Sequence, residues 1–162
     1  MIHDLMSSNV GRAKGKKLFI VSSCIVSDYP EFIENLREED DFIVKVCPEE
    51  IHINMIGYKI ASFIAYSNIR EVKVLSVEGS PHCIQLHYIV EDINRHFLRI
   101  ETKHWVLNKR RIYKISQKAI KISRHLSRIE KLIENGDSSV SYTHLRAHET
   151  EADLVCRLLL EK

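Results

Sequence analysis

The sequence lacks several features that would assign a compartment or a cofactor directly. It contains no apolar run long enough to cross a bilayer and no signal-peptide pattern, so we expect a cytoplasmic protein. It has no CxxC pair, no GxGxxG and no Walker loop, which usually mark zinc or cluster sites, dinucleotide sites and phosphate-binding loops. Internal repeats and low-complexity segments are also absent.

Cysteine and charge exclude two further classes of protein. Cys24, Cys47 and Cys83 precede residue 140, and the fourth cysteine is Cys156. Three scattered cysteines do not form the disulfide framework of a small secreted domain. The formal net charge is +2 at pH 7, and it becomes +3 when residues 139–162 are left out. So mild a charge does not call for a nucleic-acid or membrane partner.

The last stretch of the chain has a pattern unlike the rest. Val140–Lys162 resembles the translation, in one frame, of an adapter used in transposase-based sequencing libraries, with the barcode encoding about Thr150–Asp153. The resemblance implies that residues 139–162 are adapter-derived and non-native, and that the gene comes from a metagenomic library. The native chain would then be truncated at about Ser138. We therefore expect a flexible lead-in over 1–17 and one α/β domain over 18–138.

Short apolar runs alternate with helical patterns over the first hundred residues. The runs are short and rich in β-formers, which predicts buried strands at 18–21, 42–46 and 72–77. Apolar residues at helical spacing follow each run, beginning near Pro30, Met55 and Ser80. Strands that alternate with helices predict βαβ units and a parallel sheet.

The pattern changes after the third helical segment. Residues 99–107 and 111–115 predict a hairpin that turns at Asn108-Lys109, and Ser116 would then cap a long helix that ends at Asn135-Gly136. The predicted fold is a three-layer α/β domain. It has a short parallel sheet in the order βαβαβα, then a β-hairpin and a long C-terminal helix that packs on it.

The three cysteines before residue 140 each follow a predicted parallel strand. Ligands of open α/β sheets bind at the carboxyl ends of the strands, so cysteines far apart in sequence can meet there. Thiolates are ligands for zinc and for iron–sulfur clusters. We therefore predict an iron–sulfur cluster or zinc on Cys24, Cys47, Cys83 and His87. Two further histidines are candidates for the fourth ligand: His52 and His82.

Cys83 admits other interpretations. His87 lies one helical turn further on, so the pair could hold one metal ion. As the third residue of a helix capped by Ser80, Cys83 could instead be a reactive thiolate, with His87 as the base of a thiol enzyme. Cysteine is also among the most buried residue types, so all three could be core residues with no cofactor.

Two further features could bind partners. The Gly79-Ser80-Pro81 turn precedes a helix, so a phosphate or carboxylate could sit on the N–H groups of His82 and Cys83, unless Gly79 only turns the chain. The last predicted helix carries a basic stripe that could dock an acidic partner or simply face solvent. The stripe comprises Lys118, Lys121, Arg124, His125, Arg128 and Lys131, with Arg110 and Arg111 from the hairpin. Nucleic acid is a further possible partner of the stripe.

The order of strand, cysteine, helix, strand and glycine turn over Leu18–His87 also carries a family resemblance. With Cys47 and Gly79-Ser-Pro-His-Cys83, the segment resembles the small iron–sulfur subunits of hydrogenase and heterodisulfide-reductase systems, although those have glycine-cysteine motifs and more cysteines. The resemblance implies electron transfer beside a larger redox enzyme. We expect a small redox-associated protein. The alternative is a non-enzymatic binding or adaptor module with structural cysteines, an anion at the Gly79 turn and a protein partner on the basic helix.

Overall fold

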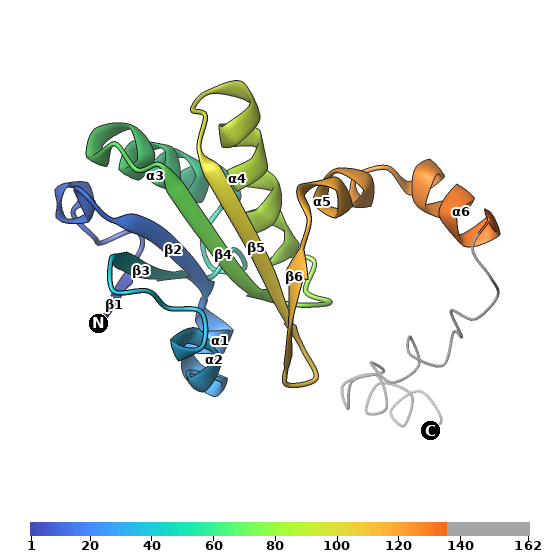
Figure 1. Ribbon diagram of the computed structural model, residues 1–162, viewed down its shortest axis with the longest axis horizontal. Helices are drawn as coiled ribbons and strands as arrows, with labels where there is room; N and C mark the ends of the chain where they lie inside the picture. The colour runs from blue at the N-terminus through green and yellow to red at the C-terminus, as the bar shows by residue number, and fades with distance from the viewer. Residues whose placement is uncertain (136–162) are drawn as a thin grey trace, which may run out of the picture. The chain divides into compact units, whose positions relative to one another are not determined.

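The structure, a computed structural model, describes residues 1–135 (Figure 1). Its centre is a six-stranded sheet in the order β1-β3-β2-β4-β5-β6. Neighbouring strands are parallel except for β5 and β6, which form an antiparallel hairpin. The strands are β1 (Ile2–Asp4), β2 (Lys17–Ser22), β3 (Asp41–Val46), β4 (Glu71–Val77), β5 (Glu101–Asn108) and β6 (Arg111–Ile115). The predicted α/β class with a parallel core is confirmed.

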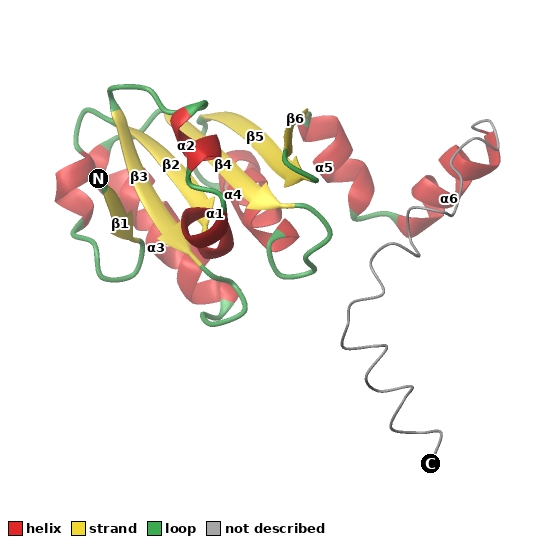
Figure 2. Ribbon diagram, turned by 90° about the horizontal axis from the view of Figure 1, so that it is seen from below, coloured by secondary structure: helices red, strands yellow, loops and turns green. Residues whose placement is uncertain are grey.

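Helices cover both faces of this sheet because its strands are apolar on both sides. The helices are η1 (Val10–Ala13), α1 (Ser23–Asp28), α2 (Glu31–Glu34), α3 (Ile53–Ser67), α4 (Ile84–His96), α5 (Gln117–Ser123) and α6 (Leu126–Asn135). Figure 2 shows α1 and α2 in front of the sheet and α3 and α4 behind it. None of the helices in residues 1–135 is long and apolar enough to cross a membrane.

Alternate residues of the central strands enter two separate cores. Leu18 and Ile20 of β2 pack in the larger core with α3 and α4, whereas Phe19 and Val21 pack in the smaller one with α1 and α2. Burial of these four side chains is complete. Each contributes about 2 kcal/mol relative to an exposed position. The central strand β2 therefore anchors both layers of helices.

The first 17 residues are not the flexible lead-in that we expected. β1 pairs with β3, so that Ile2 lies opposite Ile43, and Leu5 and Ala13 are fully buried. The Asn9 side chain accepts a hydrogen bond from the Gly11 N–H and caps η1. Because β1 is only three residues long, it lacks the apolar run by which the other strands are predicted.

The hairpin and the helices after it also differ from prediction. The turn is centred one residue later, on Lys109 and Arg110, which have φ angles of 45° and 61°. The predicted long helix is broken into α5 and α6, although no glycine or proline marks the break. Residues 1–121 form one compact unit and a second begins at Ile122. The predicted single long helix is thus two shorter helices, and α6 has no buried residue. The adapter-like tail and Gly136 lie outside the described residues.

Candidate functional site

The strand order reverses between β2 and β4. The chain moves from β2 to β3 on one side and then returns to place β4 on the other. In open α/β sheets, ligands bind outside the carboxyl ends of the strands at such a switch point. Because β3, β2 and β4 are adjacent and parallel, the segments that follow them meet at one edge. These segments carry Cys47, Cys24 and Cys83 in that order across the sheet, as the sequence suggested.

The three cysteines differ in exposure but influence one another. Cys24 is exposed in the first turn of α1, Cys47 is half-buried directly after β3, and Cys83 is buried. Partial burial raises the pKa of the Cys24 thiol, and the neighbouring Cys83 and Cys47 thiols raise it further. The loops after β3 and β4 also approach each other, since Nδ1 of His82 lies 4.0 Å from Oε2 of Glu49. The thiols therefore share one neighbourhood.

These thiols do not surround a single ion. Two sulfurs on one zinc are at most about 4.6 Å apart, because each zinc–sulfur bond is about 2.3 Å. A metal ion would need at least three cysteine, histidine or acidic side chains with their ligand atoms within 4.8 Å of one another. Within residues 1–135, only Glu38, Asp40 and Asp41 form such a group. The predicted set of Cys24, Cys47, Cys83 and His87 is not such a group, so a compact zinc site on it is not formed.

His87 belongs to a buried chain of polar side chains between β4, α4 and β5. Its Nε2 lies 2.8 Å from Oγ of Ser76, and its Nδ1 lies 3.0 Å from Nδ1 of His104. Nε2 of His104 in turn lies 2.8 Å from Oε1 of Glu91, which also accepts a hydrogen bond from the Thr102 hydroxyl. Ser76, His87, Glu91 and His104 are each at most 5% exposed.

The direction of these hydrogen bonds follows from the carboxylate. Glu91 can only accept, so His104 donates from Nε2 and, as a neutral ring, accepts at Nδ1. His87 then donates from Nδ1 and accepts at Nε2 from the Ser76 hydroxyl. Burial, followed by the charge of His104, lowers the pKa of His87 to about 3. Burial also lowers the pKa of His104, although Glu91 opposes that shift.

This chain corrects the predicted roles of His87. Both ring nitrogens are already hydrogen-bonded, so neither is available for a metal ion shared with Cys83 or for the Cys83 thiol. Ser76 and His104 were missed by sequence reasoning because their part depends on the pairing of β4 with β5. The sequence does contain a signal for this buried polar chain. His87 and Glu91 share a helix face, and His104 is a polar residue inside a predicted strand.

The Gly79 turn has the expected shape but a different helix boundary. Gly79 has a φ of 84°, which favours glycine. The Ser80 hydroxyl accepts a hydrogen bond from the Cys83 N–H at 3.2 Å. The regular helix α4 begins only at Ile84, so Cys83 is its N-cap and not its third residue. One of the two N–H groups expected to hold an anion is therefore used within the turn.

One buried polar group at this edge, the Ser22 hydroxyl, is unsatisfied. Ser22 ends β2 and is 1% exposed, and its hydroxyl has no hydrogen-bond partner among the described residues. Buried polar groups without partners are uncommon and call for an explanation. A ligand or a water molecule at the switch point would supply the missing partner.

The acidic group lies at the opposite, amino edge, where it is neutralised by lysines. Nζ of the buried Lys73 lies 2.7 Å from Glu38 and 3.0 Å from Asp41. Lys17 pairs with Glu38 and Asp40. Hydrogen bonds from Lys17 and Lys73 lower the pKa of Glu38 to about 2. With two ammonium groups in place, the cluster serves as a salt-bridge network rather than a cation site.

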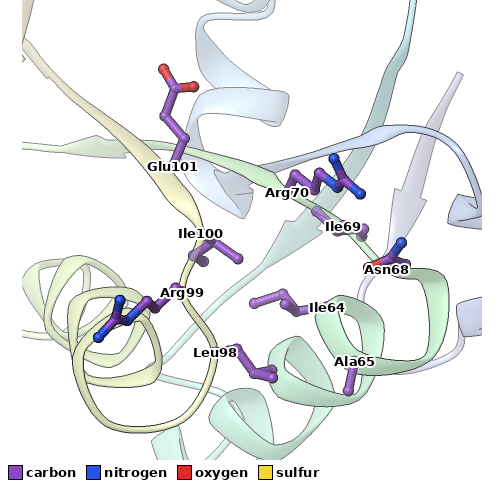
Figure 3. A pocket seen from close by; sticks show the side chains of 9 residues that line it. All are labelled: Ile64, Ala65, Asn68, Ile69, Arg70, Leu98, Arg99, Ile100 and Glu101. Carbon is purple, nitrogen blue, oxygen red and sulfur yellow. The ribbon is translucent and has the colours of Figure 1, made fainter.

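A pocket of about 480 Å³ also opens toward the amino edge, between the ends of α3 and α4 (Figure 3). Ile64, Leu98 and Ile100 form an apolar part of its lining. The side chains of Arg70 and Arg99 point away from each other in Figure 3. The lining therefore does not focus positive charge on a single point, and the pocket is separate from the cysteines.

A family model described as a Rossmann-like domain matches residues 11–148, and its last residues overlap the adapter-like stretch. No curated protein and no solved structure matches the chain. The matched segment contains β2 to β6 and the switch point at which the cysteines gather. The chain belongs to the Rossmann-like domain family.

Proposed function

We propose that the protein is a small redox-associated domain that binds an iron–sulfur cluster through Cys24, Cys47 and Cys83. One observation carries this proposal: Cys47, Cys24 and Cys83 follow the adjacent parallel strands β3, β2 and β4 and so lie at one edge, at the switch point of the sheet. The Cys83 and Cys47 thiols both raise the pKa of Cys24, which agrees with this placement. Three thiolates this close together would repel one another. A metal centre binds only deprotonated cysteine, and its positive charge would stabilise the thiolates against that repulsion.

The spacing of the thiols favours a cluster over zinc. The sulfurs are close enough to interact electrostatically, yet they are not grouped within the 4.8 Å that one ion requires. An iron–sulfur cluster holds its cysteines on different irons, so it spans a wider set of thiolates. The donor set, three cysteines at one sheet edge, fits such a cluster.

A fourth ligand would come from the histidines nearby. His82 precedes Cys83 and lies on the turn that approaches Glu49, and histidine replaces cysteine in some clusters. His52 is a poorer candidate because its Nδ1 accepts a hydrogen bond from the Asn54 N–H at the start of α3. His87 is committed to Ser76 and His104.

The bound cluster would supply one-electron transfer, and the chain would hold and tune it. Hydrogen bonds to cluster sulfurs and solvent exposure set the reduction potential. Ser22 offers an unused hydroxyl at the same edge. Exposure of Cys24 leaves that side open to a partner. A larger redox enzyme is the partner that such a carrier would serve.

The test is the iron and acid-labile sulfide content of the full chain purified without oxygen, with its visible spectrum. We expect both elements in equal amounts. Cys24→Ser, Cys47→Ser and Cys83→Ser should each lower them, whereas Cys156→Ser serves as the matched control and should not. Circular dichroism separates loss of the cluster from loss of the fold. Zinc alone, or a colourless and metal-free folded protein, would overturn the proposal.

A binding or adaptor module is the second candidate, and the burial of Cys83 favours it. Cys83 is 6% exposed, and its N–H is held by the Ser80 hydroxyl, as expected of a structural residue. In that case the edge near Gly79, Ser80 and His82 binds an anion and needs no metal. Binding of inorganic phosphate by the metal-free chain, lost on His82→Ala, would support this candidate. A thiol enzyme is disfavoured because Cys83 is buried and His87 is engaged elsewhere.

A further inference from the structure

The small net charge of the chain hides a strong separation of charge. Residues 1–101 contain 15 acidic and 11 basic residues, whereas residues 102–121 contain seven basic residues and no acidic one. This basic segment comprises most of β5, all of β6 and the first five residues of α5. A local excess of positive charge attracts polyanions even when the whole protein is nearly neutral.

Most of these cations have no acidic partner to neutralise them. Lys103 pairs with Glu71 at 2.8 Å, and Arg110 pairs with Glu31 at 3.0 Å. Four others are exposed and form no ion pair within the described part of the chain: Arg111, Lys114, Lys118 and Lys121. β6 is the last strand in the sheet order, so its outer edge is unpaired among residues 1–135.

Each face of the hairpin combines an aromatic ring with one of these cations. Side chains two apart on a strand share a face, so Arg111 and the 47% exposed Tyr113 lie on one side of β6. On the other side, Trp105 of β5 is paired directly with Lys114 of β6. Trp105 is half-buried because it packs against the smaller core, so only part of its ring is exposed. Aromatic rings beside cations are the elements with which proteins bind single-stranded nucleic acids.

The turn of the hairpin consists of two more basic residues, which adopt an unfavourable backbone conformation. Lys109 and Arg110 both have positive φ angles, in a two-residue turn that normally selects Asn-Gly. Strain of this kind persists where the residues have another role.

We propose that the β5–β6 hairpin and the first turn of α5 bind single-stranded nucleic acid. The cations contact phosphates, the exposed ring of Tyr113 stacks on a base, and the exposed part of Trp105 contacts the strand on the other face. An acidic protein would satisfy the cations but would not need a ring on each face. A duplex keeps its bases stacked inside, where these rings cannot reach them. This activity is independent of the proposed cluster, which lies beyond the carboxyl ends of β3, β2 and β4.

The test uses the full chain and the fluorescence of Trp105, the only tryptophan. Twenty-nucleotide oligo(U) and oligo(dT) should quench it and bind more weakly as salt increases, with a slope of about −0.7 per phosphate contact. A triple variant, Arg111→Gln, Lys114→Gln and Lys118→Gln, should bind at least tenfold more weakly, with a slope smaller by about 2 units. Tyr113→Ala should weaken binding about fivefold without changing the slope.

The matched control removes the same charge elsewhere, through Lys45→Gln, Arg70→Gln and Arg95→Gln, and should change the affinity less than twofold. Equal losses in the two triple variants would show that only net charge matters and would overturn the proposal. So would binding of poly-glutamate in preference to both oligonucleotides, or no binding of either at low salt. A duplex that binds as tightly as oligo(dT) without quenching Trp105 would overturn the stacking role.

Discussion

The Nδ1 atoms of His87 and His104 face each other at 3.0 Å in a site where both residues are almost fully buried. Two nitrogens at that distance need one proton between them. The Glu91 carboxylate at the end of the chain determines which ring supplies it. The domain therefore contains a buried hydrogen-bond chain with a fixed direction, from the Ser76 hydroxyl to Glu91.

We predict different tautomers for the two histidines at pH 7. His87 should carry its proton on Nδ1 and His104 on Nε2, because Glu91 accepts from the latter. Nitrogen-15 chemical shifts of the two rings, assigned with the single His→Gln variants, will report this directly. If both rings carry the proton on the same nitrogen, or if either is charged at pH 7, the proposed direction is wrong.

We predict that acid destabilises the fold through His87. Its pKa is about 3 in the folded state and 6.5 when exposed, so below pH 6.5 the unfolded chain binds the extra proton. The stabilisation is complete above pH 6.5 and decreases as the pH falls toward 3. The free energy of unfolding should be lower by about 2 kcal/mol at pH 5 from this group alone.

Urea unfolding at pH 7.5 and pH 5 will measure the difference. His87→Gln should remove most of that pH dependence, although it lowers stability at both pH values. The exposed His125 provides the control, and His125→Gln should leave the pH dependence intact. An unchanged pH dependence in His87→Gln would assign the effect to other groups.

Removal of Lys73 should be strongly destabilising. Its ammonium group is 1% exposed and pairs with the fully buried Asp41 side chain. Lys73→Met leaves that carboxylate buried without its cation, which typically costs 3–5 kcal/mol. The double variant Lys73→Met, Asp41→Leu should recover most of the loss. Chemical denaturation of both variants measures the two effects.

An exposed ion pair calibrates that experiment. Arg37→Met removes the pairing with Glu34 in a site where both side chains are largely exposed. The expected loss is at most about 1 kcal/mol. A loss in Lys73→Met no larger than this would mean that Asp41 is not dependent on Lys73.

The hairpin turn should tolerate a more favourable sequence. Lys109→Asn with Arg110→Gly relieves two positive φ angles and should raise the free energy of unfolding by about 1 kcal/mol. The lost pair with Glu31 is exposed, and Glu31→Gln measures its small share separately. If the turn variant loses more stability than Glu31→Gln does, the turn is not strained.

The sequence was sufficient for the central strands because their apolar runs are continuous. The runs at 18–21, 42–46 and 72–77 correspond to β2, β3 and β4 within one residue at each end. It also placed the three cysteines at one edge, since parallel strands share their carboxyl ends. The distances between the cysteines depend on loop conformations that no short motif encodes. The sequence therefore could not show whether the thiols are close enough to bind one zinc ion.

Other features required tertiary information. The chain from Ser76 to Glu91 joins residues of β4, α4 and β5 and exists only once β5 pairs with β4. The break between α5 and α6 falls in an uninterrupted amphipathic pattern, so periodicity could not locate it. β1 is recognisable as a strand only from its pairing with β3.

That pairing also bears on the order in which the fold assembles. During synthesis β1 emerges before β3, its one neighbour in the sheet among residues 1–135, because η1 and β2 lie between them in the chain. Residues 2–4 therefore cannot form their sheet hydrogen bonds until β3 has been synthesised. We expect the N-terminal strand to be the last of the parallel strands β1, β2 and β3 to pair, and its amides to exchange with solvent before those of β2.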